Sequence, residues 1–430
     1  MRFTFALGPN FFMEVAKLRA ARVLWATVVE AFGGKPESRA MRIHGRTTLW
    51  NKTRIDPYNN MLRATLESLS GAMGGVQSLH TGTIDEILGE PDTFSRRVAR
   101  NTQIILQEEC ELTGVIDPAG GSWFIETLTD ELAGKAWAMF QEIEQAGGAF
   151  AALQSGMIQS RIAAVREERF KHIGQRRQGL IGTNLFPDTA EKPVAANIPD
   201  YADIQRKRAA QLSAYRTSAS DDKDWTVLER LNAIASREAP LEVETVVAAA
   251  TAGATLGEIA GTLRQVEGEL PAIEALPSTR AAVKYEALRQ AASNFARDNG
   301  YRPRIFLANI GPLKRHKLRM DFTTGFFATG GFEVLPSEGF NDPSGAAKAC
   351  SESLAPIAVI CGHDEDYPEF VPRFCKAIKT LKPDIAVILA GDPGDHADTY
   401  KEAGLDDHIS ARSPNYDVNF RYLQKLGVVR

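Results

Sequence analysis

Five short apolar runs alternate with segments of helical length in the last third of the chain, and this alternation constrains the fold more than any other feature. The runs are rich in isoleucine and valine, and they read RIFLANI, FEVLP, PIAVICG, DIAVILAG and DHISA. The segments predicted to be helical are 317–330, 343–354, 368–382, 395–404 and 415–427. Strands that alternate with helices form crossovers between parallel strands. Nearly continuous apolar strands also indicate a sheet that is covered on both faces.

Residues 301–430 are therefore predicted to form a flavodoxin-like parallel sheet with strand order 2-1-3-4-5 and helices on both faces. His316 follows the first of these strands in the run GPLKRHK, at the carboxyl edge of the sheet. It is either a metal ligand at this edge or a residue of a solvated basic turn that helps to begin the next helix. The second interpretation is the simpler one.

The N-terminal part also alternates, but its helices are longer. FTFALG, MRIHGRTTL and GVQSLHT read as strands, and each is followed by a helical pattern. The pattern resembles about three late units of a (β/α)8 barrel, and closure of a barrel needs about eight strands. Residues 1–182 are therefore expected to form the C-terminal part of a barrel, with an open edge and an uncovered apolar inner face. Such a surface needs a partner chain or self-association.

The intervening residues 183–300 are expected to form a strap and a helical linker. The stretch 183–240 contains several prolines and reads as irregular, whereas 224–298 reads as mostly helical.

Composition limits the classes of function. The net charge is −4, from 50 basic and 54 acidic residues, which gives no electrostatic case for nucleic acid or an anionic membrane. No run of about 18 apolar residues occurs, and the first residues lack the features of a signal peptide. The four cysteines form no CxxC pair and no zinc spacing, as expected for reduced thiols in a cytoplasmic protein.

Several long motifs resemble one family. NFFMEVAKLRAARVLW, DPYNNMLRATLESLSGAMGGVQSLHTGTIDE, FSRRVARNTQIILQEE and VIDPAGGSWFIETLTDELAGKAW are similar to the adenosylcobalamin-dependent acyl-CoA mutases, above all methylmalonyl-CoA mutase. The resemblance extends over nearly the whole chain. It implies the late part of a substrate barrel, a linker and a cobalamin-binding-type domain. It also implies that the residues acting on the acyl group belong to a part of the barrel that this chain lacks.

The cobalamin motif of this family is degenerate here. Cobalamin-binding members carry Asp-x-His-x-x-Gly after the first strand, and the resemblance places His316 at the cobalt-binding histidine. Lys314 then stands for the aspartate and Arg319 for the glycine. Lysine cannot accept the imidazole N–H, and arginine would occupy the space of the nucleotide tail. Cys361 replaces a serine, and Gly391 lacks the glycine that usually precedes it. We therefore expect this chain to bind neither cobalamin nor a metal.

Three residues are candidates for the substrate side. Gln77 and Glu86 retain the residue types of the family, whereas Arg46 stands where active members commonly have glutamine, and Gly82 where they commonly have asparagine. Arginine is a permanent cation with donors only, so the exchange changes the chemistry of the site. The simpler interpretation is that Arg46 and Glu86 pair with each other.

Three functions remain open from the sequence. The chain resembles the non-catalytic small (beta) subunit of a heteromeric methylmalonyl-CoA mutase, which would pair with a large subunit. Alternatively, it is half of a split, active acyl-CoA mutase that a separate N-terminal barrel chain completes. A stand-alone CoA or nucleotide binding module is the third possibility, although GPLKRHK is not a glycine-rich phosphate loop.

Overall fold

The structure is a computed structural model, and it describes residues 1–188, 190–191, 194–218, 226–236, 243–264, 271–335 and 337–430. The chain divides into two compact units. The first unit contains Met1–Gln145, Ser160–Asn197 and Pro277–Arg430, and the second contains Ala146–Gln159 and Ile198–Leu276. Among the described residues, no helix combines the length and the apolar character that crossing a membrane requires.

Five parallel strands form the sheet of the C-terminal region. They are β4 (Arg304–Asn309), β5 (Glu333–Leu335), β6 (Ile357–Cys361), β7 (Ala386–Ala390) and β8 (Asp407–Ile409). Their order is β5-β4-β6-β7-β8, and every neighbouring pair is parallel. This confirms the order 2-1-3-4-5 and the strand direction predicted from the sequence. Pro336, the last residue of the expected second strand, lies outside the described residues.

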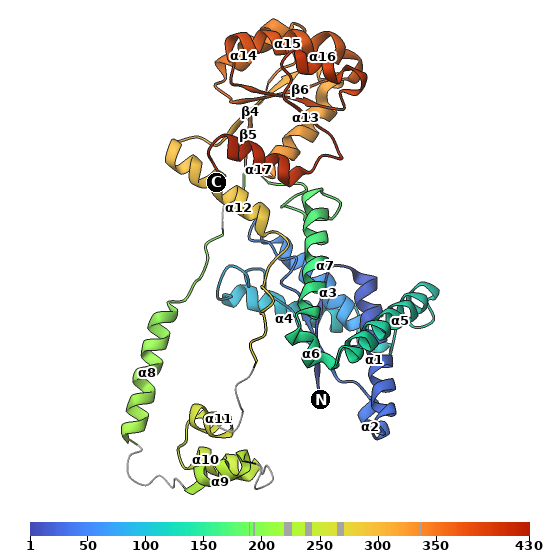
Figure 1. Ribbon diagram of the computed structural model, residues 1–430, viewed down its shortest axis with the longest axis vertical. Coiled ribbons are helices and arrows are strands. Elements are labelled where there is room, and N and C mark those ends of the chain that lie inside the picture. Colours follow the sequence, from blue (N-terminus) through green and yellow to red (C-terminus); the bar gives the residue numbers. More distant parts are fainter. Residues whose placement is uncertain (189, 192–193, 219–225, 237–242, 265–270, 336) are drawn as a thin grey trace. The chain divides into compact units, whose positions relative to one another are not determined.

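Helices cover both faces of this sheet. They are α13 (Leu313–Ala328), α14 (Pro343–Glu352), α15 (Tyr367–Leu381), α16 (Ala397–Glu402) and α17 (Asn415–Lys425), with short 3-10 turns η2 (Asp364–Asp366) and η3 (Gly394–His396). Helices α14, α15 and α16 lie on one face, and α13 and α17 lie on the other (Figure 1). Helix α13 begins at Leu313, before the predicted start at residue 317. The segment expected to be a turn is therefore the first turn of a helix.

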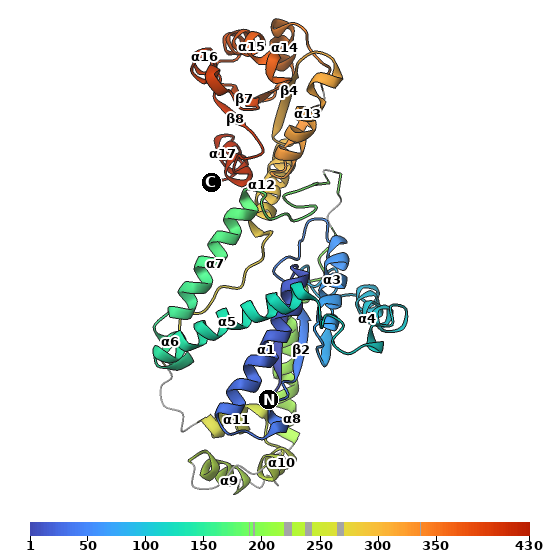
Figure 2. The ribbon, with the colours of Figure 1, turned by 90° about the vertical axis from the view of Figure 1, so that its right-hand side faces the viewer.

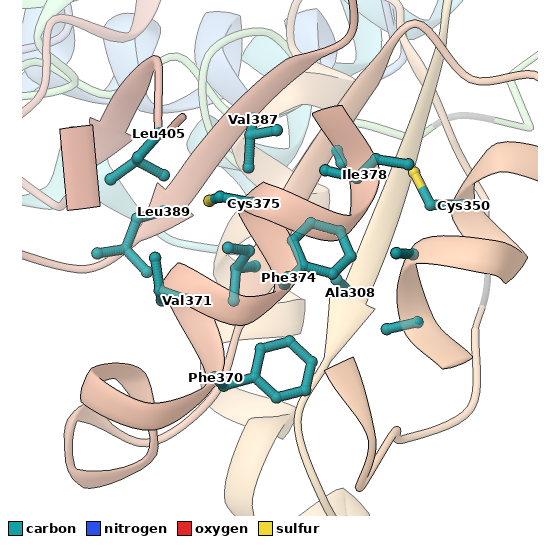
Figure 3. Close-up of a cluster of buried hydrophobic side chains, with 14 of the residues drawn as sticks. Ala308, Cys350, Phe370, Val371, Phe374, Cys375, Ile378, Val387, Leu389 and Leu405 are labelled. Atoms are coloured by element: carbon teal, nitrogen blue, oxygen red, sulfur yellow. The ribbon is translucent and has the colours of Figure 1, made fainter. Parts of the chain in front are cut away.

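Side chains of alternating strand residues form two cores, one on each face. Phe306 and Ala308 of β4 join the core under α14 and α15, whereas Ile305 and Leu307 join the core over α13 and α17. Figure 3 shows the first of these cores, in which Phe370, Val371, Phe374 and Cys375 of α15 face Val387 and Leu389 of β7. Burial on both faces explains why these strands read as continuous apolar runs in the sequence.

The N-terminal region contains a smaller parallel sheet. Its strands are β1 (Phe3–Leu7), β2 (Ile43–Thr47) and β3 (Ser78–His80), in the order β1-β2-β3. The helices of this region are α1 (Phe11–Ala31), α2 (Pro36–Arg39), α3 (Asn59–Met73), α4 (Thr93–Glu108) and α5 (Trp123–Gln145), with the 3-10 turn η1 (Leu112–Gly114). Helices α1 and α5 pack against each other (Figure 2). Phe5, Leu7, Ile43 and Leu79 pack with Leu18 of α1 in one core on the helix-covered face.

The other face of the three-stranded sheet is polar within the first unit. Its residues are Thr4, Ala6, His44, Arg46, Ser78 and His80, and each of them is exposed or half-buried. The Nδ1 atom of His44 lies 2.8 Å from the hydroxyl oxygen of Ser78. The expectation of an apolar inner face is therefore wrong, because every apolar residue of these strands except Ala6 has the parity that faces the helices.

In the described residues, seven helices lie between α5 and β4. They are α6 (Gly148–Gln154), α7 (Met157–Gly174), α8 (Tyr201–Ser218), α9 (Thr226–Ala235), α10 (Val243–Thr251), α11 (Leu256–Arg264) and α12 (Val283–Asn299). Helix α8 shows that the prediction of an irregular stretch over 183–240 is wrong at 201–218, whereas α9, α10, α11 and α12 confirm that the described residues of 224–298 are mostly helical. Residues 189, 192–193, 219–225, 237–242 and 265–270 lie outside the described part. Leu231, Ala249 and Ile259 form a small core among α9, α10 and α11.

A fully buried ion pair stabilises the segment after β2. The ammonium of Lys52 lies 2.6 Å from Glu67, and both side chains are 1% exposed. Asn51 donates a further hydrogen bond to Glu67 at 2.7 Å, and Arg280 donates to the Lys52 carbonyl at 3.0 Å. Burial lowers the pKa of Lys52 and raises the pKa of Glu67, and in each residue it outweighs the attraction of the partner charge. Each residue therefore needs the opposite charge of its partner to stay ionised in this buried position.

We predict that Lys52→Met destabilises the fold by roughly 3–5 kcal/mol, because it leaves the Glu67 carboxylate buried and unpaired. The free energy of unfolding from urea denaturation measures this cost. Arg39→Gln is the matched control, since it removes an ion pair to Glu30 whose side chains are 36% and 64% exposed; its effect should stay within about 0.5 kcal/mol. Equal costs for the two variants would contradict the prediction.

The cysteines should differ sharply in reactivity. Cys110 is exposed, whereas Cys350, Cys361 and Cys375 are buried, and burial raises the pKa of each of these three thiols to about 12. Only the thiolate is nucleophilic, so we expect a disulfide reagent at pH 8 to modify one thiol quickly in the native chain and four after denaturation. In Cys110→Ser the fast phase should disappear. A second fast thiol in the native protein would count against the burial described here.

Candidate functional site

The end of β4 is closed by the loop that follows β5. Phe340 donates its N–H to the Asn309 carbonyl at 2.7 Å, and Gly311 donates to the Phe340 carbonyl at 2.9 Å. The loop passes so close that a Cβ atom on Gly339 would lie 1.7 Å from the carbonyl oxygen of Gly311. Only glycine fits at residue 339. Ligands of open parallel sheets bind outside the carboxyl ends of the strands, so this closed end is the first candidate site.

His316 lies in the first turn of α13 and is 2% exposed. Its Nδ1 atom lies 3.2 Å from the carbonyl oxygen of Ile310. A carbonyl only accepts, so we assign a proton to Nδ1, which donates it to Ile310. A Cβ atom on Gly339 would lie 3.0 Å from Cε1 of this ring. The prediction of a solvated turn is wrong, because the loop at Gly339 covers the imidazole.

The side chain of Lys314 is exposed. Within the described part of the chain it has neither a hydrogen-bonding partner nor an ion pair. The imidazole N–H nevertheless has an acceptor, because the Ile310 carbonyl occupies the role that a carboxylate has in the family motif. The ring of His316 is therefore oriented by a main-chain carbonyl, although Lys314 cannot accept its N–H. Sequence reasoning missed this acceptor because a main-chain carbonyl leaves no signature in residue type.

A cavity of about 410 Å³ lies beside His316. Its walls come from the first turns of α13 and from the loop after β5. The residues that determine its character are Pro312, Leu313, His316, Met320, Ser337 and Glu338. This volume suits a small molecule.

Two ion pairs lie at the carboxyl edge between β4 and β6. This is the topological switch point of the sheet, because β5 lies on one side of β4 and β6 on the other. Arg315 donates to Asp366 at 2.8 and 2.9 Å, and Arg319 donates to Asp364 at 2.9 Å. The hydrogen bonds to Asp366 raise the pKa of the Arg315 guanidinium above its ordinary value. Helix α13 is thus tied to the turn η2 across the point where open sheets of this kind commonly bind ligands.

Tyr367 fills the space beside this closure. Its hydroxyl lies 2.7 Å from the carbonyl oxygen of Ala390 and 3.0 Å from that of Gly362, and it accepts the Gly362 N–H at 3.1 Å. A Cβ atom on Gly391 would lie 3.0 Å from the Tyr367 ring and 3.5 Å from the Arg319 guanidinium. The structure therefore brings Arg319 and Gly391 together, with Tyr367 between the ends of β6 and β7. Sequence reasoning did not single out this tyrosine.

Cys361 lies beneath the same edge. Its sulfur lies 3.4 Å from the hydroxyl of Thr323 on α13, and burial raises the pKa of its thiol to about 12. A fully buried, protonated thiol packs as a small apolar group and offers no nucleophile.

On the N-terminal sheet, Arg46 and Glu86 form an ion pair, which confirms the simpler interpretation of these two residues. The Oε2 atom of Glu86 is buried and has no hydrogen-bonding partner among the described residues. A Cβ atom on Gly82 would lie 2.5 Å from this oxygen. Gly82 thus leaves the carboxylate room that a larger residue would take.

Gln77 lies at the opposite end of this sheet. It precedes β3, and its side-chain oxygen accepts the N–H of Ile43 at 2.6 Å, at the first residue of β2. Arg46 lies instead near the carboxyl ends, where its register partners are Ala6 and His80. The structure therefore does not bring Gln77 together with Arg46 and Glu86. Throughout the described ranges, no group of three or more His, Cys, Asp and Glu residues could hold a metal ion.

Comparison with known proteins extends these observations. The family model for methylmalonyl-CoA mutase matches residues 1–269. The chain is 32% identical to the methylmalonyl-CoA mutase large subunit of Porphyromonas gingivalis, 34% identical to the methylmalonyl-CoA mutase of Escherichia coli and 34% identical to the methylmalonyl-CoA mutase small subunit of Streptomyces virginiae. These alignments cover 94%, 92% and 100% of this chain.

The same alignments cover 58%, 57% and 57% of the three relatives, so the chain spans less than two thirds of their length. Large and small subunits both occur among the relatives. Since the family model matches more than half of this chain, the chain belongs to the methylmalonyl-CoA mutase family.

Proposed function

We propose that this chain is a non-catalytic component of a methylmalonyl-CoA mutase-type acyl-CoA mutase, with a role like that of a small subunit and without a cobalamin site of its own. The observation that carries the proposal is the closure of the carboxyl edge by Arg319, Asp364 and Tyr367. The family uses adenosylcobalamin, which supplies a radical by cleavage of its cobalt–carbon bond.

The residues at this edge do not fit cobalamin with its nucleotide tail. The glycine of the family motif leaves room for that tail, and here Arg319 stands at its position with its guanidinium against Gly391. The ion pair to Asp364 holds the side chain in this place. The ring of Tyr367, which is 2% exposed, fills the adjoining space. A nucleotide tail in this space would have to displace both the Arg319 guanidinium and the ring of the buried Tyr367.

His316 has one property of a cobalt ligand and lacks another. The Ile310 carbonyl orients its ring, as an acceptor does for many metal-bound histidines. However, the loop at Gly339 covers the ring, which is 2% exposed and cannot meet a corrin from outside the sheet. The burial of His316 and the occupied tail space therefore both support the proposal that this chain has no cobalamin site of its own.

The N-terminal sheet supports a partner chain. Parallel sheets occur almost only with both faces covered. Within the first unit, one face of β1-β2-β3 carries His44, Arg46 and His80 toward solvent, and β1 has a free edge. We propose that a second mutase-type chain, either a large subunit or a chain that carries the other strands of a mutase barrel, covers this face. A second copy of this chain is the alternative occupant.

A split but active mutase is the second candidate function. The unpaired, buried Oε2 atom of Glu86 favours it, because a completed barrel would bring a donor to this carboxylate. The two candidates differ in one measurement. Acyl-CoA isomerisation by the mixed chains with added adenosylcobalamin, lost in Glu86→Gln, would favour the split enzyme over the structural subunit.

We predict that the chain associates through its polar sheet face, and that Ala6→Arg weakens this association by at least about tenfold. The variant places a second cation beside Arg46, and a buried like-charge pair is costly. Analytical ultracentrifugation of the chain alone, and mixed with a catalytic mutase chain, measures the effect. Thr27→Arg adds the same charge on an exposed position of α1 and should leave association unchanged. A monodisperse monomer that also does not bind the catalytic mutase chain would refute this proposal.

We also predict that the wild-type chain retains no hydroxocobalamin after desalting, as judged by the visible spectrum. Arg319→Gly should raise the affinity more than Lys314→Asp, because it opens the tail space, whereas the imidazole already has an acceptor in Ile310. The double variant should bind at least as well as Arg319→Gly. Arg315→Gly is the control: it breaks the neighbouring ion pair and adds the same helical glycine without opening space beside Gly391. Stoichiometric binding by the wild type that His316→Ala abolishes would overturn the proposal.

A further inference from the structure

Helix α3 carries its large apolar residues on its exposed side. Tyr58, Leu62 and Leu66 follow one another at four-residue spacing and are 61%, 58% and 60% exposed. Met61 beside them is 38% exposed. A surface helix ordinarily turns its apolar stripe to the core, and an outward stripe is typical of an interaction surface. The buried side of α3 is formed instead by small and polar residues, namely Asn60, Ala64, Glu67, Ser68, Ser70 and Gly71.

Helix α4 extends this apolar surface. The two helices lie side by side (Figure 2), and Met61 lines the same small gap between them as Val98 of α4. Phe94 and Ile105 lie on the same side of α4 as Val98, and they are 62% and 44% exposed. We call the six exposed residues the α3–α4 patch: Tyr58, Met61, Leu62, Leu66, Phe94 and Ile105.

The area of the α3–α4 patch suits an interface between chains. Its side chains present roughly 600 Å² of apolar surface, which is at the upper end of the largest patches on monomeric proteins. Each partner in a stable interface of standard size buries roughly 800 Å². The patch with its immediate surroundings therefore provides about what one side of a stable dimer needs.

Both charged residues of α3 are engaged inside the chain. Glu67 is 1% exposed and pairs with Lys52 at 2.6 Å. Arg63 donates to the side chain of Asn60 at 2.9 Å and to the Ile181 carbonyl at 2.7 Å. A neutral apolar stripe has no charge with which to select a charged partner, and two copies of it meet without like-charge repulsion. Its complement is a second stripe of the same kind.

We propose that the α3–α4 patch binds a second copy of this chain about a twofold axis, with the α3 helices of the two copies packed against each other. A twofold interface uses the same surface on both copies, so that surface must be complementary to itself. The spacing of Tyr58, Leu62 and Leu66 supplies this complementarity, because ridges of residues four apart pack into the grooves of an identical helix.

This dimer interface goes beyond the proposed subunit role. Helix α3 packs on the helix-covered face of the N-terminal sheet, where a Cβ atom on Gly71 would lie 2.6 Å from Leu7 and 3.3 Å from Leu79. The α3–α4 patch and the polar sheet face are therefore separate surfaces. A second copy on the patch leaves the polar face free for a mutase-type chain.

A charge placed in the stripe tests the interface. The full chain with Ala6→Arg is the background, because that change weakens association through the polar sheet face and leaves α3 untouched. Sedimentation velocity from nanomolar to high micromolar concentration should show a monomer–dimer equilibrium. Leu62→Glu should raise the dissociation constant at least about tenfold, since each copy would bury an unpaired carboxylate. Leu66→Glu should have the same effect.

Val23→Glu is the matched control. Val23 is 55% exposed on α1 and lies outside the α3–α4 patch, so the same acid at this position should leave the dimer unchanged. Glutamate is a good helix former, and all three substituted positions are exposed. Each variant should therefore keep the circular dichroism spectrum and the unfolding midpoint of the background chain.

Thiol protection then identifies what covers the stripe. Cys110→Ser is added to the background, because it removes the exposed native thiol. In this chain Leu62→Cys should react with a maleimide quickly in dilute solution, and at least about tenfold more slowly at concentrations where the dimer forms. Val23→Cys should react at the same rate at both concentrations.

Three results would overturn the proposal. A monomer at every concentration in the Ala6→Arg background would exclude the second copy. A dimer that Leu62→Glu leaves intact would place the contact on another surface. Protection of Leu62→Cys at all concentrations would show that a segment of the same chain covers the stripe. These results are independent of the polar sheet face, which is tested with the catalytic mutase chain.

Discussion

A parallel sheet must be covered on both faces, and the rest of this structure depends on how that requirement is met. In the C-terminal region the chain meets that need itself, with α14, α15 and α16 on one face and α13 and α17 on the other. Within the described residues of the first unit, helices cover only one face of the N-terminal sheet, because Phe5, Leu7 and Ile43 point to the helices while His44 and Arg46 point away. The five-stranded C-terminal sheet therefore needs no further cover. The three-stranded N-terminal sheet supports the proposal of a partner chain.

Ion pairs between α13 and η2 fill part of the carboxyl edge of the five-stranded sheet. Arg315 and Arg319 cross from α13 to the acidic turn η2, and Tyr367 joins the ends of β6 and β7. These contacts occupy the space between β4, β6 and β7. On the other side of His316, toward β5, the glycines at 311 and 339 bring two main-chain segments together and leave the cavity beside them. The first turns of α13 thus fill the carboxyl edge on the side of β6 and line the cavity on the side of β5.

Much of the larger domain could be predicted from local pattern. Strands buried on both faces must be apolar throughout, so the isoleucine and valine runs indicated β4, β6 and β7 and their order. Pairing of Arg46 with Glu86 was also accessible, because opposite charges at strand ends on one sheet edge rarely remain apart when half-buried. Helix α8 was missed because prolines precede it and its apolar residues do not gather on one face, which leaves little periodic signal.

By itself, the sequence determined the family, the alternation of strands and helices, and which residue types stand at the degenerate motif. Tertiary structure alone decided what those residues do. His316 is buried because a loop remote in sequence covers it, and its N–H finds a main-chain carbonyl that no residue type encodes. Gln77 bonds to the start of β2, which register and not composition determines. Local pattern reflects burial and periodicity, whereas main-chain acceptors, register and closure depend on segments that meet only in the folded chain.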